Sequence, residues 1–91
     1  MANQSENERE YKVIYKINYV GGGFFTFEHF SAKANSLCIN DDFNSYLTQN
    51  KPLGKTYAYN SQKPHANQGP DSIITINFSQ VASITYTHVI Q

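Results

Sequence analysis

Gly54-Lys55-Thr56 is the stretch of this chain that comes nearest to a known phosphate-binding motif. The full motif needs a further glycine five residues before Gly54, and Gln49 stands there. The motif also joins a strand to a following helix, whereas the pattern here predicts a helix followed by a strand. We therefore interpret the tripeptide as a turn.

Three consecutive glycines, Gly21–Gly23, could offer main-chain amides to an anion. No helix is predicted directly after them, so no helix dipole would assist such binding. Glycine accepts the positive φ angles that hairpin turns require. We predict that these glycines form the turn between two strands.

Side chains that bind metals or act as nucleophiles are few and scattered. His29, His65 and His88 lack the local paired spacing of zinc sites. His29 and His88 could meet, with Cys38 nearby, only if their strands were neighbours. Cys38 lies on a helical spacing with Phe30, Ala34 and Leu37, which predicts a small buried side chain rather than an activated thiol.

Asp41 and Asp42 are adjacent carboxylates, and on a helix they would point about 100° apart. They therefore suit the first turn of a helix, where negative charge is favourable, better than paired acid–base work. No Ser-His-Asp order stands in a recognisable motif. We predict that the protein is not an enzyme and has no catalytic residues, no metal site and no cofactor.

The tyrosines are the residues that most favour a binding surface, because tyrosine joins apolar area to a polar tip and is enriched at interfaces. A polar loop over residues 60–71 is the second candidate. The predicted binding residues are Tyr11, Tyr15, Tyr19, Tyr57, Tyr59, Lys63, His65 and Asn67. Each candidate surface has an alternative interpretation. The tyrosine stripe could instead be the core face, with its hydroxyls at the rim, and the loop could instead be a disordered connector.

Composition excludes several other functions. The chain has 91 residues, seven basic and seven acidic, so its net charge is zero. A DNA mimic would be strongly acidic, and a protein that binds nucleic acid through phosphate contacts would be basic. A coiled coil would be rich in Ala, Glu, Lys and Leu, whereas this chain has three leucines. We therefore predict no nucleic-acid partner.

Cysteine usage and hydropathy bear on the compartment. Cys38 is the one cysteine, so no internal disulfide can form, which favours a reducing cytoplasm. Residues 1–10 have no apolar segment of the kind found in signal peptides. No stretch approaches the roughly 20 apolar residues of a membrane span. The prediction is a cytoplasmic protein with no membrane association.

Alternating apolar and polar residues, rich in β-branched and aromatic types, predict five strands. A helix is predicted from about 40 to 50, capped by Asn40 or Asp41, with an apolar stripe of Phe43, Tyr46 and Leu47. The segment before it, from Ser31, is predicted to be helical or irregular: a weaker helical spacing covers residues 30–38, with Ser31 as its cap. The predicted strands are Tyr11–Val20, Phe24–Phe30, Lys55–Asn60, Ser72–Phe78 and Ala82–Ile90.

Matching the apolar faces of neighbouring strands predicts two hairpin registers. With a loop at Gly21–Gly23, Ile17 faces Phe27, and the charges of Lys16 and Glu28 meet on the other face. With a connection at 79–81, Ile76 faces Ile84.

The predicted fold is therefore of the α+β class. It is a single small domain over residues 11–91, preceded by a disordered polar tail at 1–10. About five strands, in the order β-β-α-β-β-β, form a mainly antiparallel sheet that is curled or barrel-like, with one short helical segment. The alternative is a flat sheet whose second face is covered by a partner chain.

A homodimer is also predicted, because so small a domain is marginal alone. If the strand at 11–20 lay at a sheet edge, it could pair across a two-fold axis.

In its high content of Asn, Ile, Lys and Tyr, the chain resembles the short accessory proteins of phages and mobile elements from AT-rich bacteria. That resemblance is compositional and rests on no specific motif. It implies a protein that inhibits a host defence system, such as a CRISPR nuclease, by contact.

We thus predict a small non-enzymatic protein that occupies a protein partner. The alternative function is a small barrel that sequesters a nucleotide or another small ligand between aromatic side chains.

Overall fold

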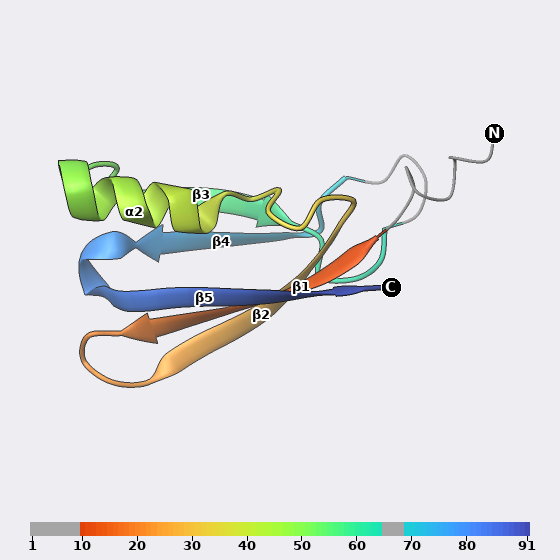
Figure 1. Ribbon diagram of the computed structural model, residues 1–91, viewed down its shortest axis with the longest axis horizontal. Coiled ribbons are helices and arrows are strands. Elements are labelled where there is room, and N and C mark those ends of the chain that lie inside the picture. Colours follow the sequence, from red (N-terminus) through yellow and green to blue (C-terminus); the bar gives the residue numbers. More distant parts are fainter. Residues whose placement is uncertain (1–9, 65–68) are drawn as a thin grey trace.

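The computed structural model describes residues 10–64 and 69–91. The five predicted strands and the helix from about 40 to 50 are confirmed, with ends that shift by one or two residues. The predicted tail lies outside the described residues except for Glu10. The elements in chain order are β1 (Tyr11–Tyr19), β2 (Phe24–Ser31), α2 (Ile39–Gln49), β3 (Gly54–Tyr59), β4 (Ser72–Asn77), a short 3-10 helix (Phe78–Gln80) and β5 (Val81–Ile90) (Figure 1).

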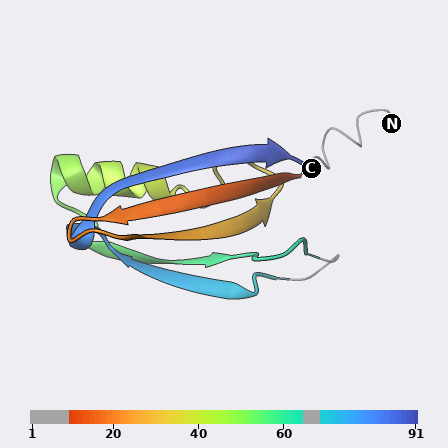
Figure 2. The same cartoon turned by 90° about the horizontal axis from the view of Figure 1, so that it is seen from below.

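The strands form antiparallel sheets, and together with one short helix they confirm the α+β class. They divide between a three-stranded sheet of order β2-β1-β5 and a two-stranded sheet of order β3-β4. Figure 2 shows the two sheets as separate curved layers, with α2 near the β5 side of the larger one. The curl that the sequence predicts is present, but the sheets do not close into a barrel.

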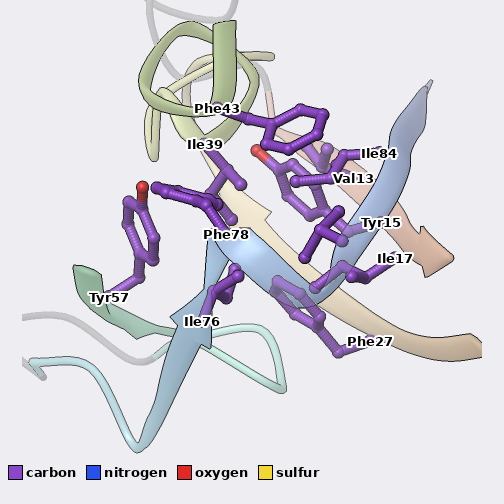
Figure 3. Packing of buried hydrophobic residues seen from close by; sticks show 11 residues of the cluster. Val13, Tyr15, Ile17, Phe27, Ile39, Phe43, Tyr57, Ile76, Phe78 and Ile84 are labelled. Atoms are coloured by element: carbon purple, nitrogen blue, oxygen red, sulfur yellow. The ribbon is translucent and has the colours of Figure 1, made fainter. Parts of the chain in front are cut away.

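One cluster of buried side chains joins the two sheets and α2 (Figure 3). The odd-numbered residues of β1 supply its centre, because period-two alternation turns Val13, Tyr15 and Ile17 to the same face. The ring centroids of Tyr15 and Phe27 lie 5.0 Å apart within the larger sheet. Those of Phe27 and Tyr59 lie 4.6 Å apart and join the two sheets. The cluster comprises Val13, Tyr15, Ile17, Phe27, Ile39, Phe43, Tyr57, Ile76, Phe78, Val81 and Ile84.

The predicted register of the first hairpin is wrong, because each residue of β1 pairs with the residue of β2 that lies two positions before the predicted partner. Ile17 pairs with Phe25, not Phe27, and Lys16 pairs with Thr26. The loop starts one residue earlier than predicted, since the Tyr19 amide donates to the Gly23 carbonyl at 3.1 Å. A three-residue hairpin loop needs a positive φ at its last position, and Gly22 supplies it with φ 97°.

The parity of this register survives the correction, so the predicted faces are right. The predicted ion pair between Lys16 and Glu28 is replaced by another: the Glu28 carboxylate lies 3.9 Å from the Lys12 ammonium. Both side chains are partly exposed, so this ion pair adds little to stability.

The predicted second hairpin does not form. Ile76 does not face Ile84, because β4 pairs with β3 while β5 pairs with β1. The 3-10 turn between β4 and β5 carries the chain from one sheet to the other, with Phe78 fully buried between them. In this arrangement β1 lies between β2 and β5, so it is not the edge strand that the predicted dimer contact required.

Of the two alternatives for the segment before α2, helical or irregular, the structure has the irregular one. Residues 32–37 form bends and turns instead of a helix, and Ser31 belongs to β2. The Ser31 hydroxyl donates to Ser36 Oγ at 2.9 Å, a local bond that competes with helix formation. Because the predicted helical spacing does not form, Cys38 is exposed rather than buried.

The predicted caps of α2 are wrong as well. Cys38 occupies the cap position in a left-handed conformation, with φ 58° and no side-chain cap bond. Asn40 lies in the first turn, and its Nδ2 donates to the Ile84 carbonyl at 2.9 Å, which ties α2 to β5. Of the predicted stripe, Phe43 is buried and Tyr46 half-buried, but Leu47 faces solvent.

Candidate binding groove

The tyrosine stripe that the sequence singles out is mainly core. Tyr15 and Tyr57 are buried, and Tyr11 and Tyr59 pack against the core cluster at its margin. Only Tyr19, at the end of β1, remains 37% exposed. The alternative in which the stripe is the core face therefore describes four of these five tyrosines.

Two of the buried hydroxyls have different surroundings. Tyr57 donates to Asp42 Oδ2 at 2.7 Å, and the Lys55 ammonium lies 3.1 Å from the same oxygen. Tyr15 points its hydroxyl toward α2 (Figure 3), where no hydrogen-bond partner lies among the described residues. Burial raises the pKa of Tyr15 to about 12 and raises the pKa of Tyr57 still further, with Asp42 adding to the latter shift. Both hydroxyls stay protonated at neutral pH and serve packing rather than chemistry.

This contrast predicts opposite effects for one chemical change. Tyr15→Phe is expected to leave the free energy of unfolding unchanged or to raise it by about 1 kcal/mol, because it removes a buried unpaired hydroxyl. Tyr57→Phe is expected to lower that free energy by about 1–2 kcal/mol, because it removes a bond to a carboxylate. Urea unfolding of both variants measures the two effects, and equal losses would contradict the assignment.

His29 is buried and joins three segments. Its Nδ1 accepts the Asn60 amide proton at 3.1 Å, so Nε2 carries the ring proton and donates to Ser36 Oγ at 2.9 Å. Burial lowers the pKa of His29. Val13 pairs with His29 on one side and His88 on the other, so β1 separates the two histidines. Their strands are therefore not neighbours, and the condition for a meeting of the two histidines is not met. Residues 10–64 and 69–91 contain no group of three or more side chains that could hold a metal ion.

The base of the polar loop is held by one carboxylate. Asp71 Oδ1 accepts bonds from the Ser61 amide at 2.9 Å and from the Ser72 hydroxyl at 2.8 Å. These hydrogen bonds lower the pKa of Asp71. Of the three predicted binding residues in this loop, Lys63 is exposed and lies 3.8 Å from Glu10, while His65 and Asn67 lie outside the described residues.

A groove of about 340 Å³ opens between the β1–β2 hairpin and β4. Tyr19 and Phe25 contribute aromatic side chains from the hairpin, and Ile74 and Ile76 contribute aliphatic side chains from β4. Its described lining contains no charged residue. The lining residues are Tyr19, Phe25, Ile74, Thr75, Ile76, Asn77 and Gln80.

Of the predicted binding residues that lie within the described ranges, Tyr19 alone lines this groove. Phe25, Ile74 and Ile76 were not predicted as site residues, although their alternation with polar residues placed them on inward faces. The sequence could not identify these three residues because it did not place β4 correctly. In the predicted hairpin, Ile74 and Ile76 would lie beside β5, whereas in the structure β4 pairs with β3. At the open end of the two layers, residues on the inward faces line the groove, and buried Ile76 belongs to both the groove and the core cluster.

Hydrophobic side chains also gather at the same end of the molecule. The turn between β1 and β2 lies at the lower left of Figure 1, and the C-terminal end of α2 with the connection to β3 lies at the upper left, so these segments share the end of the molecule opposite the C-terminus of the chain. These segments expose six hydrophobic side chains. We call this the apolar end, and it consists of Tyr19, Val20, Phe24, Phe25, Leu47 and Leu53, each 37–63% exposed.

No protein-family model matches this chain, and neither a curated protein nor a solved structure resembles it at a significant level. The part of the chain that the structure describes contains no helix with the length and apolarity that crossing a membrane requires.

Proposed function

We propose that the protein is a small, non-enzymatic binding protein that contacts another protein through the apolar end. The observation that carries this proposal is the concentration of exposed hydrophobic side chains there. Exposed apolar patches of several hundred Å² on a small protein mark interaction sites.

The groups with perturbed pKa values support a non-enzymatic role, because each serves the fold. Tyr57 and Asp42 tie β3 to α2, and Asp71 closes the base of a loop. His29 uses both ring nitrogens in hydrogen bonds, so neither is free to act as a base. We further propose that the protein inhibits its partner by occupying it in the cytoplasm, as the accessory proteins that it resembles in composition do.

The proposal predicts that a charge at the apolar end weakens binding. Tagged wild-type protein and Val20→Asp are compared by affinity capture from the host cell, with Thr85→Asp on the exposed face of β5 as the matched control. Wild-type and Thr85→Asp are expected to capture the same protein, and Val20→Asp roughly ten-fold less, because burial of an unpaired carboxylate opposes binding. Equal capture by all three would contradict the proposal.

A second candidate function is supported by the groove itself. Tyr19 and Phe25 could hold a flat, neutral aromatic ligand such as a nucleobase against Ile74 and Ile76. A thermal-shift panel of nucleosides and nucleotides separates the two functions, because a ligand at 100 times its Kd adds about 2.7 kcal/mol to stability. A flat response favours the protein-binding function.

A further inference from the structure

We propose that the groove accepts an extended, uncharged peptide segment of a partner protein, which adds as a further strand to the free edge of β4. The inference rests on the proposed protein-binding function and names the part of the partner that is recognised. Strand addition of this kind draws affinity from main-chain hydrogen bonds and specificity from pockets for alternate side chains.

The first argument is the direction of the main chain in β4. The Phe78 amide donates to the Leu53 carbonyl at 3.0 Å, so position 78 is hydrogen-bonded to position 53 across the pair. Hydrogen-bonded and non-bonded pairs alternate along antiparallel strands. Ile76 and Ile74 therefore bond to β3, while the main-chain groups of Thr75 and Asn77 point away from it. Among the described strands, β4 has no second neighbour that would use them.

The second argument is which residues line the groove. Four consecutive residues of β4, from 74 to 77, border it, although successive side chains point to opposite faces. Ile74 and Ile76 reach the groove with their side chains. Thr75 turns its side chain to the other face, where its hydroxyl lies 2.8 Å from that of Thr56, so Thr75 borders the groove with its main chain. The free amide and carbonyl thus open into an apolar trough.

The third argument is the shape and charge of that trough. Its far wall is the β1–β2 hairpin, with Tyr19 and Phe25, and its volume of about 340 Å³ is small for a ligand site. A few side chains of one extended segment fit this space. A second copy of this chain would bring a whole sheet behind its edge strand, and that sheet would meet the hairpin wall. The lining carries no charge, so a charged side chain entering it would lose its hydration without a partner.

The experiment uses the purified full-length protein and a random dodecapeptide display library. The peptides expected to be enriched are uncharged and apolar at every second position, and the most enriched one is synthesised as the probe. Thr75→Pro removes the amide proton that the peptide would use and is expected to weaken probe binding roughly ten-fold. Thr75→Val is the matched control, because it also loses the bond to Thr56 but keeps the amide. It is expected to bind as wild-type does.

Hydrogen exchange at Thr75 gives a second measurement that needs no variant. Its amide is expected to exchange more slowly in wild-type protein when the probe peptide is bound. Unchanged exchange, equal binding by Thr75→Pro, or enrichment of charged peptides would each overturn the proposal. A sedimentation mass of twice 10.3 kDa that Thr75→Pro returns to one chain would show a second copy at this edge and overturn it too.

The outcomes also separate this inference from the proposed function. If Val20→Asp loses the captured partner while Thr75→Pro keeps it, the protein-binding function stands and strand addition at β4 fails. If both variants capture the partner as wild-type does, the proposed function itself fails.

Discussion

Replacement of Phe78 by alanine is expected to lower the free energy of unfolding by about 3–5 kcal/mol. Phe78 is fully buried in the turn that joins β4 to β5, and its ring lies 5.6 Å from that of Phe43 and 6.0 Å from that of Tyr46. Its loss would open a cavity where α2 meets both sheets, and the rigid backbone around the turn could not close it. Urea unfolding followed by circular dichroism measures the change.

Phe24→Ala is the matched control for this experiment. The Phe24 ring is 60% exposed and lies on the outer face, where the Lys16 ammonium sits 4.5 Å from its centroid. Its truncation is expected to cost about 1 kcal/mol or less, since little apolar area returns to water and an exposed cation–π contact is weak. Similar losses for the two variants would show that Phe78 does not anchor the core.

Acidification below about pH 6.5 is expected to destabilise the protein through His29. Burial lowers the pKa of His29 in the folded protein, whereas the unfolded chain has the ordinary histidine pKa of about 6.5. The unfolded chain therefore takes up the proton first as the pH falls. The stability from this group is complete above pH 6.5 and is lost as the pH falls toward the folded pKa, at up to about 1.4 kcal/mol per pH unit.

The structure supplies the reason why the neutral ring is required. Its Nδ1 accepts the Asn60 amide proton at 3.1 Å, and protonation would place two donors face to face. His29→Gln is expected to lose about 1–3 kcal/mol at pH 7.5 and to remove the loss of stability that begins as the pH falls below about 6.5. His88→Gln, on the exposed β5 strand, is the control and is expected to keep that pH dependence. An unchanged pH dependence in His29→Gln would refute the assignment.

Local sequence patterns determined the elements of this protein. Alternation along residues 11–19 set which side chains of β1 face inward, because β geometry makes any such strand two-faced. The same alternation set the parity of the first hairpin, so the faces were right although Ile17 pairs with Phe25 rather than Phe27. The three glycines located the turn, but only hydrogen bonds between its ends decided where the loop begins.

Strand partners were decided by packing over long distances in the chain. The alternation of β4 and β5 is equally compatible with pairing to each other and with pairing to β3 and β1. Burial of Phe78 against Phe43 favours the second arrangement, and no local pattern encodes that contact. A contact over a long distance in the chain also decided the role of Asn40 at the start of α2. Asn40 could cap a helix, yet its side chain donates to the Ile84 carbonyl, 44 residues away.

The candidate site shows the same division. The sequence by itself determined that Tyr19 and Phe25 lie on one face of a hairpin and that Ile74 and Ile76 share a face of another strand. Only the tertiary structure decided that these faces meet across an open groove while Tyr15 and Tyr57 are enclosed. The physical reason is that period-two patterning specifies which way a side chain points, whereas exposure depends on whether another layer covers it.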